Sequence, residues 1–188
     1  LYLTPIFKAN TTHKYDTVDY LQIDPDFGTE EDLRELTGKA HEAGMYVVLD
    51  AVFNHTSRDF FAFRDLLEHQ ENSRYRDWYY VDEFPARGEI LPTYRSFSYF
   101  GGMPKLNCRN PEVRQYVCDV AAYWTRNCQV DGWRLDVADE IGRDFWREFR
   151  RKLREINPRI LIIGEIWHFN GSYLAGDQWD GVMNYHFT

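Results

Sequence analysis

The sequence predicts an α/β fold with a parallel sheet. Two continuously apolar runs, MYVVLD (45–50) and ILIIGE (160–165), are typical of parallel strands that are covered on both faces. Segments with helix start and stop signals alternate with such runs along the chain. This alternation of strand and helix favours a parallel sheet with helices packed against it.

The first half of the chain contains a strand, a helix and a second strand. LYLTPIF (1–7) is too short for a helix and is rich in β-branched and aromatic residues, so we expect a buried strand. A helix is predicted from Thr29 to Ala43, because Thr29 can cap it, Asp32 completes an approximate capping box and Gly44 ends it. The run 45–50 follows as the next strand.

The second half repeats the alternation. Asn110 is a good cap for a helix that has Pro111 at its first position and runs to about residue 127. A further helix, over 143–156, is closed by the Asn-Pro pair that follows it. The remaining strands are predicted at VDGWRLD (130–136), ILIIGE (160–165) and GVMNYHF (181–187).

Residues 53–107 interrupt the alternation. This segment is rich in Tyr, Phe, Arg and Gly and shows no clear periodicity. The gap between the strands at 45–50 and 130–136 is too long for one crossover connection. We interpret the segment as a small irregular domain inserted between a strand and its helix. The predicted organisation is therefore 1–52, the first part of the sheet domain, 53–107, the insertion, and 108–188, the second part.

Composition excludes several classes of partner. The 188 residues are 44% hydrophobic and 28% charged, which is ordinary for a globular chain with a sizeable core. A net charge of −8 and the lack of a basic run argue against nucleic acid and anionic membrane as partners. No apolar stretch approaches the roughly 18 residues of a membrane span.

The three cysteines are expected to be reduced thiols. Their odd number argues against a disulfide framework. Cys118 and Cys128 should lie about 15 Å apart on one helix, whereas a disulfide requires Cα atoms within about 7 Å. Reduced cysteines favour a cytoplasmic over a secreted location.

Three of the predicted strands end in carboxylates, which are Asp50, Asp136 and Glu165. The carboxyl ends of parallel strands lie on one side of a sheet, and in a (β/α)8 barrel that side carries the active site. We therefore expect the three acids to converge on one rim. His55, at the end of DAVFNH (50–55), should reach the same rim.

GWRLDVADE (132–140) places a cation beside one of these acids. Trp133, Leu135 and Val137 alternate as in a half-buried strand, so Arg134 and Asp136 should share the other face. A fixed cation should hold the pKa of Asp136 low. An ionised carboxylate of this kind suits a nucleophile or an anionic stabiliser.

Glu165 has different neighbours, because it follows an apolar strand and precedes Ile166 and Trp167. An apolar wall would keep this carboxyl group neutral, as a general acid requires. One charged and one neutral carboxyl group are what glycoside cleavage uses, since the acid protonates the leaving oxygen and the carboxylate meets the oxocarbenium-like carbon. His55 would then be a candidate for hydrogen bonding to sugar hydroxyls.

Four segments together resemble the α-amylase family of glycoside hydrolases: DAVFNH (50–55), MPKLN (103–107), GWRLDVADE (132–140) and GEIWH (164–168). MPKLN, the pair after Glu165, and HKYDTVDY (13–20) resemble its neopullulanase/cyclomaltodextrinase branch. The resemblance covers nearly the whole chain. It implies an α-glucan oligosaccharide as the partner, with cleavage of α-1,4 bonds, and α-1,6 bonds as a second linkage, in maltooligosaccharides, cyclodextrins or pullulan. Substrate-binding residues would be His55, Arg134, Asp50, Trp167, His168 and Tyr15.

The same resemblance implies a retaining mechanism. Asp136 matches the nucleophile, Glu165 the acid/base, and Arg134 the residue that orients the nucleophile. Asn54 matches a position that holds calcium in many members of the family. Because this branch often lacks that site, we expect no required cofactor, with Asn54 as the calcium candidate. Two positions depart from the branch: Asp139 stands where Asn is common, and His186 where Pro is common.

The resemblance implies an incomplete (β/α)8 barrel, with strands two to six and the insertion after the third barrel strand. A whole barrel takes about 250 residues. The family's third catalytic acid lies in a His-Asp segment after the seventh strand, and the 188 residues contain no His-Asp pair. We therefore expect this polypeptide alone to be inactive. Unpaired sheet edges would also favour a homodimer.

Two other functions fit the same residues. One is a catalytically silent carbohydrate-binding relative, which the presence of both Asp136 and Glu165 disfavours. The other is a metal-dependent (β/α)8 hydrolase with Asp50, His55, Asp136 and Glu165 as ligands, which Arg134 disfavours by placing a cation where the metal would be. The balance between hydrolysis and transglycosylation is open.

Overall fold

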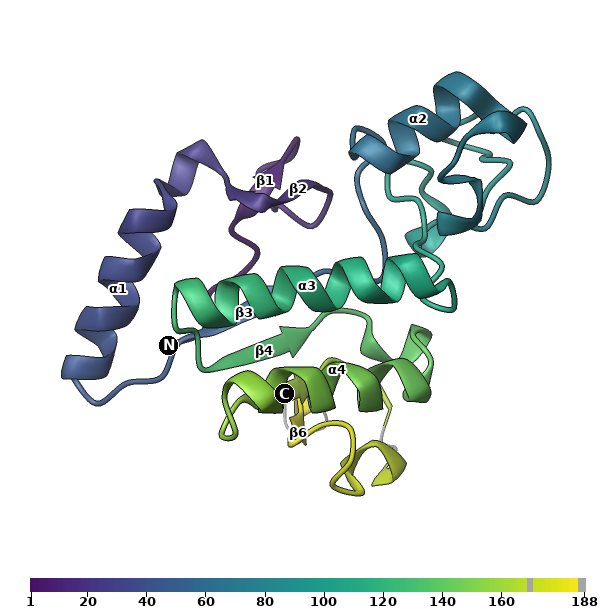
Figure 1. Cartoon of the computed structure of the whole chain (residues 1–188). Helices are drawn as coiled ribbons and strands as arrows, with labels where there is room; N and C mark the ends of the chain where they lie inside the picture. Colours follow the sequence, from purple (N-terminus) through teal and green to yellow (C-terminus); the bar gives the residue numbers. More distant parts are fainter. Residues whose placement is uncertain (169–170, 186–188) are drawn as a thin grey trace.

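The computed structural model describes residues 1–168 and 171–185, and a four-stranded parallel sheet organises them (Figure 1). The strands lie in chain order: β3 (Val48–Ala51), β4 (Gly132–Leu135), β5 (Leu161–Gly164) and β6 (Gly181–Val182). The long helices are α1 (Glu30–Glu42), α3 (Pro111–Asn127) and α4 (Arg143–Ile156). The predicted α/β class with a parallel sheet is thus confirmed.

Local capping explains where the helices begin. Thr29 and Asp32 form a reciprocal capping box at α1, as predicted. The Asn110 side chain accepts the backbone N–H of Glu112 at 2.8 Å, and Pro111 is the first residue of α3. Both ends of α4 also lie at the predicted residues.

The prediction of a strand over 1–7 is wrong in most of its length. Tyr2 forms a single parallel bridge to Val48, and Phe7 belongs instead to β1 (Phe7–Ala9). This short strand pairs antiparallel with β2 (Thr17–Ile23), which the sequence analysis did not predict. The chain therefore leaves the parallel sheet after a few residues and forms a separate two-stranded ribbon. The last predicted strand is also shorter, and its residues 186–187 lie outside the described residues.

The core lies between the sheet and the helices. Trp133 and Leu135 of β4 are fully buried, and α3 and α4 pack against each other beside the sheet (Figure 1). Arg134, on the opposite face of β4, is also buried. The expectation of a half-buried strand is therefore wrong, because polar side chains from neighbouring strands cover the second face.

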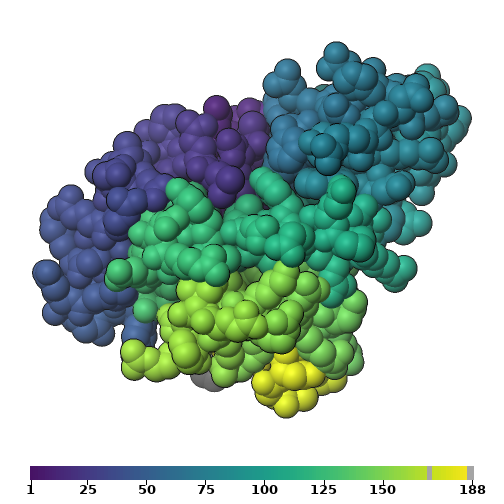
Figure 2. All heavy atoms as spheres, viewed as in Figure 1, coloured from purple at the N-terminus to yellow at the C-terminus, as the bar shows by residue number. Residues whose placement is uncertain are grey.

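The segment 53–107 contains α2 (Phe61–His69) and the short 3-10 helices η2 (Gln70–Asn72), η3 (Arg76–Trp78) and η4 (Phe97–Tyr99). The remaining 3-10 turns are η1 (Pro25–Phe27), η5 (Ala138–Glu140) and η6 (Gly171–Leu174). In the space-filling view the part around α2 projects as a lobe beyond the helices (Figure 2). The boundaries of an inserted domain at 53 and 107 remain a prediction.

The sequence predicted that the chain contains no membrane span and that its cysteines are reduced. Within the described part of the chain, no helix combines the length and the apolar character that crossing a bilayer demands. Cys108, Cys118 and Cys128 are free thiols, and all three are buried.

Candidate active site

The register of the sheet brings the predicted polar side chains to one face. Asp50 of β3 lies directly opposite Arg134 of β4, and Arg134 lies opposite Ile163 of β5. Residues two positions apart on a strand point the same way. Asp136 and Glu165, each two residues beyond one of these partners, therefore continue the same face past the strand ends.

Arg134 connects all three acids. Its Nη1 lies 2.9 Å from Asp50 Oδ1 and 2.8 Å from Asp136 Oδ1, and its Nη2 lies 2.9 Å from Glu165 Oε1. The arginine side chain is only 7% exposed, so these bonds are shielded from water. Tyr2 and Tyr15 donate their hydroxyls to Asp50 Oδ2 at 2.6 Å and 3.2 Å.

The charge balance of this cluster contradicts one prediction. Burial raises the pKa of Asp136, the Asp50 carboxylate raises it further, and Arg134 opposes both. Burial likewise raises the pKa of Asp50 against the opposing effect of Arg134. The expected low pKa of Asp136 is wrong, because one guanidinium is shared by three buried carboxyl groups rather than serving Asp136 alone.

The carboxylate of Glu165 has polar partners where the sequence predicted an apolar wall. Glu165 Oε2 accepts the backbone N–H of Val137 at 3.0 Å, and Oε1 accepts the Tyr185 hydroxyl at 2.8 Å. Val137 has φ 47° and ψ 43°, a left-handed conformation that is costly for a β-branched residue. This strained peptide aims its N–H at Glu165. Gly164 is needed before Glu165, since a methyl group there would lie 2.3 Å from the Trp179 ring.

A cavity of about 430 Å³ opens beside these acids. Six residues predicted for the site line it: Tyr15, His55, Arg134, Asp136, Glu165 and Trp167. Trp167 is 70% exposed and stacks on Tyr185 with ring centroids 4.4 Å apart. Among the described residues, His168 stands outside this lining, 3.8 Å from Asp139. Asp50 lies behind Arg134 and is not part of the wall.

The other residues of the wall were not predicted as site residues, and they are His13, Phe97, Met103, Val137, Asp139 and Glu140. Most of them lie inside the motifs that resemble the family, so membership of a motif could have identified them as residues of the site. Tyr2 and Tyr185, which bond to the acids, lie in apolar strand-like runs. Nothing in those runs distinguishes them from core tyrosines.

His55 is held by the protein on both sides of its ring. It is buried and stacks on Phe97 with ring centroids 4.9 Å apart. Its Nε2 lies 3.1 Å from the Tyr15 carbonyl, and its Nδ1 lies 3.3 Å from the Asn54 amide. Burial lowers the pKa of His55 to about 3, so the ring is neutral. A hydrogen bond to a sugar hydroxyl would replace one of these bonds.

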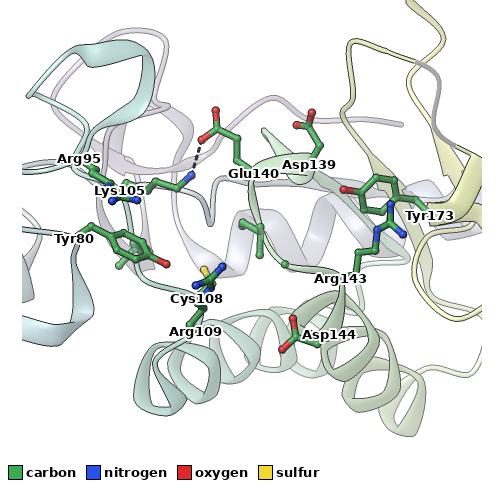
Figure 3. A pocket seen from close by; sticks show the side chains of 13 residues that line it. Tyr80, Arg95, Lys105, Cys108, Arg109, Asp139, Glu140, Arg143, Asp144 and Tyr173 are labelled. Atoms are coloured by element: carbon green, nitrogen blue, oxygen red, sulfur yellow. Dashed lines mark hydrogen bonds and ion pairs between the residues drawn. The ribbon is translucent and has the colours of Figure 1, made fainter.

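Asn54 does not suit a calcium ion. Its Oδ1 accepts a hydrogen bond from Lys105 Nζ at 2.6 Å, and Lys105 also pairs with Glu140 at 2.5 Å. Figure 3 shows this lysine and Glu140 at a second cavity, of about 400 Å³. Calcium needs six to eight oxygen ligands, and an ammonium group already takes the amide oxygen. The described residues also contain no cluster of three His, Cys, Asp or Glu side chains able to hold a metal ion.

Replacing Lys105 with methionine should therefore lower the free energy of unfolding by about 1–3 kcal/mol, because the buried Asn54 oxygen loses its donor. Thermal denaturation of the full-length protein measures this loss. We expect excess EDTA to leave the wild-type midpoint unchanged, and calcium not to restore the variant. A midpoint that rises with calcium in the wild type would contradict this account.

The sheet and the cluster define a class of protein. Acids at the carboxyl ends of successive parallel strands, beside an aromatic-lined cavity, are the arrangement of (β/α)8-barrel glycoside hydrolases. The family model described as "Alpha amylase, catalytic domain" matches residues 1–188. The chain belongs to this family.

Named relatives support the assignment. A "Maltogenic alpha-amylase" from Bacillus acidopullulyticus is 51% identical over 185 residues, covering 98% of this chain and 32% of the relative. "Neopullulanase 2" from Thermoactinomyces vulgaris is 51% identical over 188 residues, covering 100% and 32%. "Intracellular maltogenic amylase" from Bacillus subtilis is 45% identical, covering 100% and 32%. The chain spans about a third of the length of these relatives.

Solved structures agree with the fold. A "Cyclomaltodextrinase" structure superimposes with a TM-score of 0.96 and 50% identity, over 99% of this chain and 32% of that one. The ligand-free "Cyclic alpha-maltosyl-(1-->6)-maltose hydrolase" from Arthrobacter globiformis gives 0.93 and 43%, over 98% and 42%. The parallel sheet is therefore part of a (β/α)8 barrel.

Proposed function

We propose that the full-length protein is a retaining glycoside hydrolase that cleaves α-glucosidic bonds of glucan oligosaccharides. One observation carries the proposal: Asp136 and Glu165 bond to the same guanidinium and line the same cavity. Two carboxyl groups so placed can act on one glycosidic bond from its two sides. The relatives are named for maltogenic, cyclodextrin-cleaving and pullulan-cleaving activities, which supports maltooligosaccharides, cyclodextrins and pullulan as the substrate class.

In this proposal the two acids have different roles. Glu165 gives its proton to the glycosidic oxygen while an oxygen of Asp136 bonds to the anomeric carbon and the leaving sugar departs. Glu165 then takes a proton from water, which attacks the same carbon and releases Asp136. Arg134 holds both carboxyl groups in place, and Val137 and Tyr185 fix the orientation of Glu165. Trp167 offers an exposed ring beside the acid.

Glu165→Gln tests the acid role. The substitution should lower kcat on maltotriose by about 10²- to 10⁴-fold, while the first-turnover release of fluoride from an α-maltosyl fluoride is largely spared because fluoride leaves without protonation. NMR of the first wild-type product should show the α-anomer. We expect the polypeptide of residues 1–188 alone, without a His-Asp segment, to release no sugar. Equal losses on both substrates, or a β-anomeric first product, would refute the proposed mechanism.

The same results separate the alternatives. A silent binding relative would bind oligosaccharide and release no product at any concentration of the full-length protein. A metal-dependent hydrolase would lose activity in EDTA, whereas the Arg134-centred cluster requires no metal. For compartment we propose the cytoplasm, supported by three buried free thiols and by the name of the Bacillus subtilis relative. A homodimer remains our proposal for the assembly.

A further inference from the structure

A smaller cavity adjoins the one beside the acids. Its volume is about 250 Å³, and it shares His13 and Met103 with the wall of the larger cavity. The loop that precedes β2, the segment after residue 57, and Phe100 and Gly102 all contribute to its lining. The two cavities are therefore neighbours, within reach of one extended oligosaccharide.

Phe100 lines this cavity and packs against Gly102. A methyl group on Gly102 would lie 2.3 Å from the nearest ring carbon of Phe100, so the ring rests directly on the glycine backbone. The side chain is nevertheless 53% exposed. The ring is therefore in contact with the glycine backbone and also accessible to a ligand. Its neighbour Tyr99 is 91% exposed but does not line the cavity.

Other residues of the cavity wall carry hydrogen-bonding groups. Asn10 Nδ2 donates to Asp59 Oδ2 at 2.6 Å and to Ser57 Oγ at 3.2 Å, which orders the three side chains. Arg58 is fixed by the Gly88 carbonyl at 2.9 Å. An aromatic ring and a few ordered polar groups in one cavity are the composition of a site for a ligand with one apolar face and polar edges.

We propose that this cavity is an outlying subsite for one glucosyl unit of a longer α-glucan, with Phe100 as its stacking platform. The inference rests on the proposed function and extends it to substrate length. The pyranose ring has an apolar face of C–H bonds and a rim of hydroxyl groups. Its C–H face would lie on Phe100, and its hydroxyls would meet Asn10, Asp59 and Arg58. Short substrates that fill only the larger cavity would not reach it.

The test compares two substrate lengths in the full-length protein. Phe100→Ala should lower kcat/KM for maltoheptaose by about three- to tenfold, the range expected for an aromatic stacking contact, and leave kcat/KM for maltotriose unchanged. Gly102→Ala should have the same selective effect, because the added methyl group displaces the ring. Phe100→Tyr, which keeps the ring, should behave as the wild type.

Tyr99→Ala is the matched control, since it removes an adjacent and more exposed ring from outside the cavity. It should change neither substrate. The subsite alone is overturned if Phe100→Ala affects both lengths equally or neither, or if Tyr99→Ala reproduces its effect. A wild-type protein that cleaves no glucan of either length would overturn the proposed function and this inference with it.

Discussion

Replacing Arg134 with methionine should lower the free energy of unfolding by about 3–5 kcal/mol at neutral pH, the usual cost of leaving buried charges without their partner. The side chain is only 7% exposed and contacts Asp50, Asp136 and Glu165 within 2.9 Å. Methionine fills similar volume and removes every one of these bonds. Glycosidase activity should be lost as well, because the guanidinium that ties Asp136 to Glu165 is then missing.

Denaturant unfolding of the full-length protein at two pH values measures this effect. The deficit of Arg134→Met should shrink as the pH falls, because the carboxyl groups then accept protons and no longer repel one another. Arg134→Lys should recover part of the stability and little activity, since an ammonium group cannot bridge three carboxylates with the geometry of a guanidinium.

Arg147→Met provides the matched control. Arg147 also pairs with a carboxylate, Asp177, but its side chain is 51% exposed. Exposed pairs contribute about 0–1 kcal/mol, so the same substitution there should change stability little. If the two variants were equally stable at pH 7, the claim that Arg134 stabilises the fold by compensating three buried carboxyl groups would be contradicted.

The accuracy of the sequence predictions follows the range of the interactions involved. The ends of α3 were predicted correctly because the Asn110 cap and the proline after it act on the adjacent backbone. The convergence of Asp50, Asp136 and Glu165 was also accessible, since it needs only the parallel direction of successive strands. The β1–β2 ribbon could not be predicted, because its pairing depends on contacts that no local sequence pattern indicates.

The pKa shift of Asp136 could not be predicted from the sequence for the same reason. The pairing of Arg134 with Asp136 is visible two residues apart in one strand. The sharing of that arginine with Asp50 and Glu165 arises only when three strands are in register. Two of the polar partners, Tyr2 and Tyr185, come from segments whose composition indicates only apolar packing. Proximity in the fold, absent from the sequence, therefore reversed the expected direction of the pKa shift of Asp136.

Asp136→Asn should lower kcat by about 10⁴-fold or more, as expected for loss of a nucleophile, and yet stabilise the folded protein. The folded state binds a proton at Asp136 more tightly than the unfolded chain does, since burial and Asp50 raise its pKa. Folding stability therefore falls as the pH rises from the unfolded pKa, about 3.9, through the folded one. At pH 8 the wild type bears the full cost of that ionisation, and asparagine, which can still accept from Arg134, bears none.

The expected gain is about 1–2 kcal/mol at pH 8, the size typical of relieving a strained functional site. It should disappear below about pH 4, where Asp136 is protonated in both states. Paired thermal and denaturant unfolding of wild type and variant across this range gives the difference directly. A variant less stable than the wild type at pH 8, or a gain that grows as the pH falls, would mean that Arg134 outweighs burial and Asp50 at this carboxylate. The low pKa first expected from the Arg134–Asp136 pair would then be correct.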